Sequence, residues 1–403
     1  MLKEFIYRVK KLNHLVMTWL LGALPANLYY GFPSHKLKVI MITGTDGKTT
    51  SSTLTYKVLS QAGKKVGLVS TVAAYIGDTE IDTGFHVTTP GPWELQKFLA
   101  EFVKQKFEYV VIEATSHGIY QFRTWGIKPS IAGLTNITQN EALDYHVSYE
   151  NYVDAKCQKL KQANSIWINK EDESYKLVTQ LLPIKKTHAY SALKEMSAKA
   201  AAAITARFPE PYNHANATLV YKIAETIGIS DNDFCLAIQN FQTVTGRMQS
   251  VPNKLGLKII VDFAHTPNAL HQALSSLRQT LPANKKLIAI FGCAGLRDPR
   301  KRAPMGKWAA KLADFAIFTA EDPRTENIWS IIRQMKEELK EHHDHIISIP
   351  DREQAIQFAL KKLAQEGDTI AIFGKGHEHS MAYGSVEYAW NDMNTVQKIL
   401  KTI

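Results

Sequence analysis

Apolar segments typical of buried β-strands alternate with amphipathic helical patterns along almost the whole chain. In the first series, LKVIMIT (37–43) predicts a buried strand, a helix is expected from about Lys48 to near Gly63, and the alternation continues to SIWINK (165–170). A second series runs from LKIIVDFAH (257–265) to DTIAIFGKG (368–376). Because alternating strands and helices assemble into β-α-β units, both halves predict an α/β fold with a mostly parallel sheet.

The length of 403 residues exceeds what one hydrophobic core normally organises, so more than one domain is expected. The polar segment TVTGRMQSVPN (243–253) separates the two series, and the boundary is predicted between residues 246 and 247. The prediction is a short apolar helical segment over 1–37, a central domain over 38–246, and a Rossmann-like α/β C-terminal domain over 247–403.

The net charge of +10 and the isoelectric point of about 9.2 favour anionic partners. No block of Lys and Arg with interleaved aromatic residues is present, so a nucleic-acid partner is not expected. The three cysteines, Cys157, Cys235 and Cys293, lack metal-ligand spacing and leave an odd one unpaired. Such cysteine usage fits a reducing compartment, and a cytoplasmic protein is expected.

An apolar stretch near the amino end, LVMTWLLGALPANLYYGFP (15–33), is interrupted by Pro25 and Asn27. It is too broken for a membrane span, which needs about 20 apolar residues. A signal peptide is an alternative, since ALPA (23–26) weakly resembles a cleavage site. The favoured interpretation is an amphipathic helix that packs on the body of the protein or makes peripheral contact with a membrane surface.

The segment MITGTDGKTT (41–50) follows an apolar strand and precedes a helix, which is the context of a phosphate-binding loop. Its glycines allow backbone N–H groups to converge on an anion, the helix N-terminus adds its dipole, and Lys48 adds a charge. Thr49 or Thr50 is suited to ligate Mg²⁺. The longer P-loop spacing would need glycine at Ile42, so a strand-to-helix turn with a chance lysine is the alternative. The favoured prediction is a P-loop-type ATPase domain.

Two further candidates follow the strand segment YVVIEATSHG (109–118). Glu113 stands at the carboxyl end of this strand, the edge where ligands bind in open α/β sheets, and its carboxylate could hold Mg²⁺. A surface glutamate in a loop is the alternative. His117 fits a structural or a catalytic histidine equally well.

Helical spacing places Lys156 on the apolar face of the segment SYENYVDAKCQKL (148–160). A buried ammonium group is costly, so this side chain must extend to solvent, pair, or lose its charge. Reaction with CO₂ would convert it to an anionic carbamate able to ligate a metal. Spacing alone favours extension to solvent and leaves the carbamate open.

In the second half, polar side chains recur where strands are predicted to end, which predicts a ligand site rich in cations along one sheet edge. Arginines there would grip the carboxylates of a substrate. Scattered solvated loop charges are the alternative. The residues are Asp262, His265, Arg297, Arg324, Lys375, His377 and Glu378.

Several of these segments, in this order, resemble the Mur ligases, the ATP-dependent amino-acid ligases of peptidoglycan synthesis. They are TGTDGKTT, IEATSHG, LDYHVSYENYVDAK, TVTGRM, VDFAHTPNAL, GLRDPRKRAPMG, EDPRTE and GKGHE. The resemblance covers about residues 38–403 and is greatest to the members that extend a muramyl dipeptide. It implies that ATP phosphorylates the carboxylate of UDP-MurNAc-L-Ala-D-Glu, and that the amine of a diamino acid then attacks the acyl phosphate.

The resemblance also implies roles, carried over position by position. As catalytic residues it implies Lys48, Glu113, His117 and a carbamylated Lys156. For ATP it implies Gly44, Thr45, Asp46, Gly47, Lys48, Thr49, Thr50, Asn213, Asn216, Arg247 and Asp262. For the muramyl acceptor it implies Thr88, Thr89, Thr115, Gln121 and Arg123. For the amino acid it implies Arg297, Glu321, Asp322, Pro323, Arg324, Gly374 and Glu378. For Mg²⁺ it implies Thr49, Glu113 and Lys156.

The chain departs from the family pattern in three places. The family has a longer uridine-binding domain before the phosphate loop, so we expect the acceptor to be held by its sugar-peptide alone, by a partner protein, or to be another acid. Ala142 replaces a histidine that helps to bind a second metal, with Glu141 or His146 as substitutes. In EDPR (321–324), Asp322 replaces asparagine, while the retained Arg324 favours meso-diaminopimelate over L-lysine.

Two other functions stay open on the sequence alone. One is a ligase of the same architecture that acts on a folate or another γ-glutamyl acceptor. The other is a degenerate relative that binds nucleotide or a partner without catalysis. A monomer is expected.

Overall fold

The computed structural model describes residues 2–72, 74–76, 79–81, 89–139, 143–339 and 344–403. The chain divides into two compact units, residues 1–242 and 243–403. Both units are mixed α/β structures built on mainly parallel sheets, as the strand and helix pattern predicts.

The first unit opens with three consecutive helical segments, α1 (Leu2–His14), the π-helical η1 (Leu15–Ala23) and α2 (Leu24–Tyr30). Pro25 lies in the first turn of α2, directly after the π-helical η1. Gly31 ends α2 in the left-handed conformation, and a short 3₁₀ turn, η2 (Pro33–Lys36), leads into the first strand. Within the described part of the chain, no helix is long and apolar enough to cross a membrane.

An eight-stranded sheet in the order β4-β3-β2-β5-β1-β6-β7-β8 forms the centre of this unit. The strands from β2 to β8 in this order are parallel, and the β3–β4 hairpin adds an antiparallel edge. The strands are β1 (Lys38–Thr43), β2 (Val66–Val69), β3 (Ala74–Ile76), β4 (Thr79–Ile81), β5 (Tyr109–Glu113), β6 (Ile131–Leu134), β7 (Ser165–Asn169) and β8 (Thr187–Tyr190).

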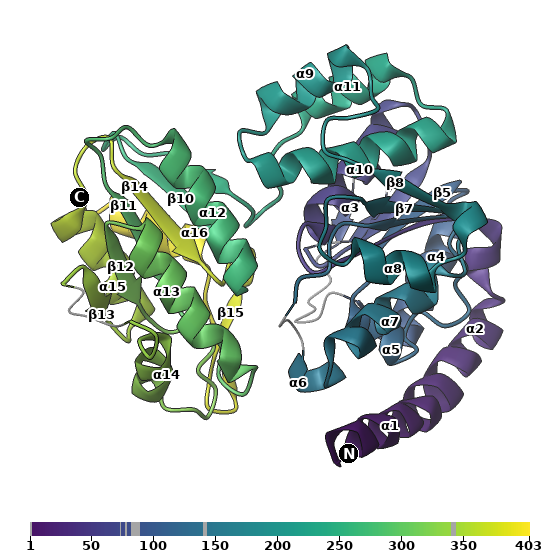
Figure 1. Ribbon diagram of the computed structural model, residues 1–403, viewed down its shortest axis with the longest axis horizontal. Helices are drawn as coiled ribbons and strands as arrows, with labels where there is room; N and C mark the ends of the chain where they lie inside the picture. Colours follow the sequence, from purple (N-terminus) through teal and green to yellow (C-terminus); the bar gives the residue numbers. More distant parts are fainter. Residues whose placement is uncertain (1, 73, 77–78, 82–88, 140–142, 340–343) are drawn as a thin grey trace. The chain divides into compact units, whose positions relative to one another are not determined.

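Helices cover both faces of this sheet (Figure 1). Val39 and Met41 of β1 pack on the side of α4, whereas Ile40 and Ile42 pack on the side of α3 and α10, so the central strand is apolar on both faces. The helices are α3 (Lys48–Gln61), α4 (Pro92–Lys104), α5 (Ser116–Tyr120), α6 (Leu143–His146), α7 (Tyr149–Leu160), α8 (Tyr175–Leu181), α9 (Ala198–Arg207), α10 (Pro211–Ile227) and α11 (Asp231–Asn240), with a 3₁₀ turn, η3, at Ile184–Lys186.

The second unit has a six-stranded sheet in the order β13-β12-β11-β14-β10-β9, in which only β9 is antiparallel, and a separate hairpin of β15 and β16. Its strands are β9 (Gln249–Val251), β10 (Lys258–Asp262), β11 (Leu287–Phe291), β12 (Phe315–Phe318), β13 (Ile346–Ser348), β14 (Thr369–Phe373), β15 (Ser380–Tyr383) and β16 (Val386–Ala389). Its helices are α12 (Pro267–Thr280), α13 (Arg302–Leu312), α14 (Ile328–Met335), α15 (Arg352–Phe358) and α16 (Asp392–Leu400), with short turns η4 (Pro299–Lys301) and η5 (Ala359–Leu363).

The sheet registers fix where polar side chains meet. In the first unit, Ile42 of β1 pairs with Glu113 of β5, so the loop after β1 begins beside the end of β5. In the second unit, Asp262 of β10 pairs with Phe373 of β14, which brings the following Gly374 to the same sheet edge. Both edges are carboxyl edges of parallel strands, where ligands bind in open α/β sheets.

Candidate active site

The loop between β1 and α3 is tightly packed around its two glycines. Gly47 has φ +77°, and a Cβ there would lie 2.3 Å from Oδ1 of Asn216. A Cβ on Gly44 would lie 1.8 Å from Oγ1 of Thr135. Both positions therefore require glycine, and a backbone without side chains is what an approaching phosphate needs.

The same loop is held by hydrogen bonds from the turn after β6. Asn136 accepts from the N–H of Thr45 through its carbonyl at 2.8 Å and from the N–H of Asp46 through its side chain at 2.9 Å. Thr135 donates its hydroxyl to the Asp46 carbonyl at 2.7 Å. The Lys48 ammonium donates to the Thr45 carbonyl at 2.6 Å, which folds this cation back over the loop. The loop is thus a preformed cradle that carries the Lys48 ammonium and the Asp46 side chain.

Thr49 and Glu113 form the candidate Mg²⁺ site. The Thr49 hydroxyl donates to one Glu113 carboxylate oxygen at 3.0 Å, and the N–H of Thr71 donates to the other at 3.0 Å. Glu113 is buried, so these bonds orient a carboxylate shielded from solvent. Hydroxyl and carboxylate oxygens are the donors that Mg²⁺ prefers, with phosphate oxygens and water completing its shell. Thr50, one residue further along α3, is half-buried.

No group of three His, Cys, Asp or Glu side chains that could hold a metal occurs among the described residues. Ala142 and Glu141, named above for a second metal, lie outside the described residues.

Lys156 is buried with 1% of its surface exposed, so the interpretation that it extends to solvent is wrong. Its ammonium donates to the carbonyl of Gly44 at 2.6 Å and lies 4.5 Å from the centre of the Tyr152 ring. Burial lowers the pKa of Lys156 well below its ordinary value, and the nearby charge of Lys48 lowers it further. The lowered pKa favours the neutral form of this amine, and the neutral form is the one that reacts with CO₂.

His117 lies in a cluster of aromatic rings beside α7. Its ring centre is 4.1 Å from that of Tyr145 and 5.3 Å from that of His146. His146 is hydrogen-bonded through Nε2 to the Ser116 hydroxyl at 3.0 Å, and burial lowers its pKa to about 2, with His117 and Lys156 adding to the effect. His146 is therefore a neutral side chain at physiological pH.

The residues predicted to hold the acceptor gather around the start of α5. The Thr89 and Thr115 hydroxyls are 3.0 Å apart, and Arg123 donates to the Thr89 carbonyl at 2.8 Å. Gln121 donates to the Tyr145 hydroxyl at 2.7 Å. Burial lowers the pKa of the Arg123 guanidinium below its ordinary value. Thr88 lies outside the described residues.

On α10, the two asparagines predicted for the adenine side are in contact with each other. Asn216 donates to the Asn213 side-chain oxygen at 3.2 Å, and Asn213 donates to Glu210 at 3.2 Å. Because Asn216 also packs against Gly47, this pair is joined to the phosphate loop.

In the second unit, Arg247 and Asp262 are linked by two contacts between their neighbours in the chain: Arg247 contacts Phe263, which follows Asp262, and Asp262 contacts Met248, which follows Arg247. The Arg247 guanidinium lies 4.6 Å from the centre of the Phe263 ring. Asp262 accepts from the backbone N–H of Met248 at 2.6 Å and of Ala264 at 2.7 Å. The carboxylate therefore fixes the turn that follows β10.

An ion-pair network forms the candidate amino-acid site. Buried Lys375 pairs with Asp322 at 2.8 Å and with Glu378 at 2.5 Å. Arg324 lies 3.8 Å from Asp322 and donates to the Gly295 carbonyl at 2.6 Å. The predicted edge is thus a mixed network of cations and carboxylates, rather than a site lined mainly by cations.

Glu321 is buried directly behind this network. Burial raises the pKa of its carboxyl to about 7, against the opposing effect of nearby Lys301, Arg352 and Lys375. Its Oε2 atom has no hydrogen-bond partner among the described residues, and a Cβ on Gly374 would lie 2.3 Å from it. A carboxyl poised near neutral pH beside a glycine is suited to receive an ammonium group.

The other residues predicted along this edge have separate settings. Arg297 is exposed, and Pro323 is buried. His265 is bonded through Nδ1 to the Phe263 carbonyl at 3.0 Å. Burial lowers the pKa of His377 to about 3, with Arg247 adding to the effect.

Three residues not anticipated from the sequence support the site. Tyr152 is bonded to the Thr45 hydroxyl at 3.0 Å, and Asn136 holds the phosphate loop as described. Arg352 donates to the carbonyls of Ala320 and Phe373 at 3.1 and 2.8 Å, so it braces the segments just before Glu321 and Gly374. Asn136 comes just after an expected strand, and that position indicates a ligand-binding edge of the sheet. Arg352 begins an ordinary amphipathic helix, and nothing in the sequence indicates its role.

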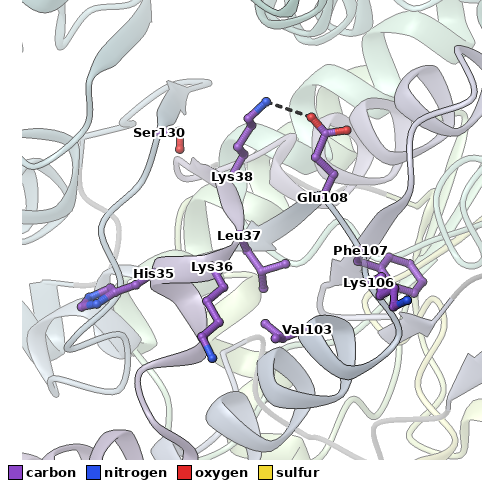
Figure 2. Close-up of a pocket in the computed structure, with 9 residues that line it drawn as sticks. All are labelled: His35, Lys36, Leu37, Lys38, Val103, Lys106, Phe107, Glu108 and Ser130. Atoms are coloured by element: carbon purple, nitrogen blue, oxygen red, sulfur yellow. Dashed lines mark hydrogen bonds and ion pairs between the residues drawn. The ribbon is translucent and has the colours of Figure 1, made fainter.

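A hollow of about 650 Å³ lies elsewhere, at the amino ends of β1 and β5 (Figure 2). Lys38 and Glu108 form an ion pair at 2.8 Å on its wall. Because the phosphate loop follows the carboxyl end of β1, this hollow lies at the opposite edge of the sheet. Its lining contains none of the predicted site residues.

A glycine cradle with a lysine, and a carboxylate on the adjacent parallel strand, define an α/β protein of the nucleoside-triphosphate-binding class. The model of the Mur ligase middle domain matches residues 42–225, and that of the Mur ligase glutamate ligase domain matches residues 246–376. The chain belongs to the Mur ligase family, whose members are ATP-dependent ligases that form amide bonds.

Curated relatives match over nearly the whole chain. UDP-N-acetylmuramoyl-L-alanyl-D-glutamate–2,6-diaminopimelate ligase of Clostridium botulinum is 34% identical over 402 residues, which cover 94% of this chain and 81% of that protein. The ligases of the same name from Parabacteroides distasonis and Geobacillus kaustophilus are 34% and 32% identical, over 93% and 94% of this chain and 80% and 82% of theirs.

Solved structures agree. A UDP-N-acetylmuramoyl-L-alanyl-D-glutamate–2,6-diaminopimelate ligase superposes with a TM-score of 0.57 at 27% identity, over 91% of this chain and 78% of that chain. The bifunctional folylpolyglutamate synthase/dihydrofolate synthase of Yersinia pestis has a TM-score of 0.67 at 16% identity, over 94% and 93% of the two chains. The second likeness shows a shared fold alone.

Proposed function

We propose that this protein is an ATP-dependent ligase that joins a diamino acid, meso-diaminopimelate in preference to L-lysine, to UDP-MurNAc-L-Ala-D-Glu. The observation that carries the proposal is the combination of Glu113, Lys48 and buried Lys156 around one glycine loop, in a chain that matches ligases of that name almost end to end. Peptidoglycan synthesis is the process in which such a product is used.

The chemistry needs a leaving group, because a carboxylate is a poor electrophile. Transfer of the terminal phosphoryl group from ATP to the acceptor carboxylate gives an acyl phosphate and ADP. The amine of the amino acid attacks the acyl carbon, and phosphate leaves from the tetrahedral intermediate as the amide forms. The protein must hold anions close together, so its cations and dipoles carry much of the catalytic effect.

Residues of the first unit would handle the phosphates. The backbone of residues 44–47 and the N-terminus of α3 would bind the phosphate chain, and Lys48 would neutralise charge as the phosphoryl group moves. Mg²⁺, when bound by Thr49 and Glu113, would screen the negative charge of the nucleotide from the approaching carboxylate. Carbamylated Lys156 would add an anionic oxygen ligand at the loop.

Other residues would select the substrates. Thr89, Thr115 and Arg123, which share one hydrogen-bonded cluster, would hold the muramyl peptide. Glu321 would receive the ammonium of the amino acid, and Arg324 would bind the distal carboxylate of diaminopimelate. The remaining residues named for the adenine and amino-acid sites keep the roles that the family resemblance implies.

A substrate screen tests the proposal. The full chain is incubated with ATP, Mg²⁺ and UDP-MurNAc-L-Ala-D-Glu, together with meso-diaminopimelate or L-lysine, and the product mass and ADP release are measured. The expected result is ADP release with the mass of a tripeptide product, larger with diaminopimelate. Absence of turnover with both amino acids would contradict the proposal.

Two added acceptors sharpen the screen. MurNAc-L-Ala-D-Glu without the uridine nucleotide measures how much the nucleotide contributes to binding. A folate with glutamate tests the function suggested by the shared fold of folylpolyglutamate synthase. Turnover on the folate, and none on either muramyl peptide, would replace the proposed acceptor by a γ-glutamyl one.

A further inference from the structure

The first helices of the chain present an apolar stripe on the outside of the first unit. We propose that this stripe, defined by Phe5, Val9, Leu12 and Val16, docks the protein on the surface of an anionic lipid bilayer. The inference is independent of the ligase activity, because it concerns a face of α1 and η1 that carries none of the predicted site residues.

The stripe follows from helical geometry. Its four residues are spaced i, i+4, i+7 and i+11, which places them along one side of a helix. Their exposed fractions are 65%, 49%, 61% and 44%, whereas apolar side chains of this size are ordinarily buried. Further exposed apolar residues continue along the same segment, at Ile6, Leu15, Met17, Leu20, Leu21, Leu28 and Tyr29.

Side-chain contacts fix the opposite side of the segment to the body of the unit. Tyr7 stacks on Tyr120 at 4.7 Å between ring centres and accepts the Tyr120 hydroxyl hydrogen at its carbonyl at 2.7 Å. The His14 ring is bonded to the Tyr145 hydroxyl at 2.9 Å. Because the inner side is held by polar and aromatic contacts, α1 cannot turn its stripe inward without breaking them.

The charges around the stripe select the kind of surface. From Phe5 to Thr45 the sequence contains no Asp or Glu, but it contains Arg8, Lys10, Lys11, Lys36 and Lys38. Arg8, Lys10 and Lys11 are exposed, and the Lys10 and Lys11 ammonium groups lie 5.4 and 5.9 Å from the centres of the Tyr145 and Tyr120 rings, on the side of α1 that faces the body. An apolar face on a helix with exposed cations is the pattern that lies at a bilayer interface, where acyl chains receive the apolar side chains and anionic headgroups receive the cations.

A second copy of the chain is the less suitable occupant. In a symmetric contact the stripe of one copy would meet the stripe of the other. Arg8 of both copies would then approach one another, and the basic residues of α1 outnumber its one carboxylate, Glu4. Like charges at an interface oppose association, whereas an anionic bilayer attracts them.

Sedimentation with lipid vesicles tests the inference on the full chain. Vesicles of phosphatidylglycerol and phosphatidylcholine are compared with vesicles of phosphatidylcholine alone, at low and at high salt. We expect binding to the anionic vesicles that is weakened by salt, and roughly tenfold or more weaker binding to the neutral ones.

Three variants assign the binding to the stripe. Val9→Glu with Leu12→Glu places two carboxylates on the stripe and is expected to lower the vesicle partition coefficient at least about tenfold. Arg8→Glu should reduce binding to anionic vesicles alone. Ile184→Glu is the matched control, because Ile184 is 88% exposed in the same unit but lies outside the first helices. Vesicle binding by this variant should be unchanged.

Each other outcome overturns the inference. Failure of the unmodified chain to bind anionic vesicles would do so, as would equal binding to neutral vesicles or undiminished binding by the double variant. If light scattering shows a dimer that the double variant converts to a monomer, with no vesicle binding, the stripe belongs to a second copy. Near-ultraviolet circular dichroism and the ligase assay confirm that the variants, all at exposed positions, remain folded.

Discussion

The Lys156 ammonium lies 2.6 Å from the carbonyl oxygen of Gly44, so a residue of α7 is bonded directly to the first glycine of the phosphate loop. The two residues are separated by 112 positions in the sequence. Burial lowers the pKa of this amine and so favours its neutral form, which is the form that carbamate formation with CO₂ requires.

Lys156→Ala is expected to lower kcat/KM roughly a hundredfold or more, because it removes the anionic ligand that the carbamate would supply. Short carboxylic acids such as acetate should partly restore the activity by entering the space that the side chain leaves. Lys159→Met is the matched control, since Lys159 is a second buried lysine on α7 that donates instead to the Ile127 carbonyl at 2.8 Å. An unchanged rate for Lys156→Ala would remove the carbamate from the mechanism.

Glu113→Gln tests the candidate Mg²⁺ site. The amide keeps the size of the side chain and one oxygen for the bond from Thr49, whereas the negative charge and the acceptor for the Thr71 N–H are lost. We expect the concentration of Mg²⁺ needed for half-maximal rate to rise, with kcat reduced on the order of a hundredfold. Glu108→Gln, at the other end of the same strand region, should leave both quantities unchanged. A normal Mg²⁺ dependence of Glu113→Gln would place the metal elsewhere.

Most of the fold could be predicted from the chain because its buried strands are continuous apolar runs. The segment LKVIMIT contains β1, and α3 begins at Lys48, where a helix is expected to begin. Strands outside the two main sheets could not be predicted from apolar runs. The hairpin of β15 and β16 contains Tyr383, Val386 and Tyr388, whose side chains are exposed, so it carries no strong apolar pattern.

The candidate site was predictable where residue type and strand end coincide, as for Glu113 after a buried strand. Contacts between distant segments left no such signal. Arg352 opens α15 like any solvated helix residue, and its partner Asp392 lies 40 positions later. Lys156 shows the same limit, because spacing places it on an apolar face without showing that Gly44 accepts its hydrogen bond.

Loss of one partner of the buried ion pair between Arg352 and Asp392 should strongly destabilise the second unit. Both side chains have no exposed surface, and two hydrogen bonds of 2.7 and 2.8 Å join them. Arg352→Met would leave a carboxylate buried without its partner, which costs about 3–5 kcal/mol in similar cases. Urea unfolding of the full chain measures the change. Lys398→Met, which removes an exposed pair with Glu353, should leave the midpoint unchanged.

Glu321 predicts a pH dependence of stability. Its pKa is raised to about 7 in the folded protein, so between pH 4.5 and 7 the folded state binds the proton that the unfolded state has released. Stability contributed by this group is therefore present at low pH and lost as the pH rises through this range. Glu321→Gln cannot ionise, and its stability relative to the unmodified protein should increase from pH 5 to pH 8 by on the order of 3 kcal/mol. A constant difference would show that Glu321 is already ionised in the fold.

Asp322→Asn is expected to shift the choice of amino acid. In the present network Asp322 lies 2.8 Å from Lys375 and 3.8 Å from Arg324, so its carboxylate competes with a substrate carboxylate for the arginine. The N–H of Ala382 donates to Asp322 at 2.9 Å, and asparagine keeps an oxygen for this bond. It removes the charge that competes for Arg324. The ratio of kcat/KM for meso-diaminopimelate to that for L-lysine should rise several-fold, because only diaminopimelate presents a distal carboxylate to Arg324. Arg324→Met should abolish this gain in the double variant. If the ratio stays unchanged in Asp322→Asn, Arg324 does not read the distal carboxylate.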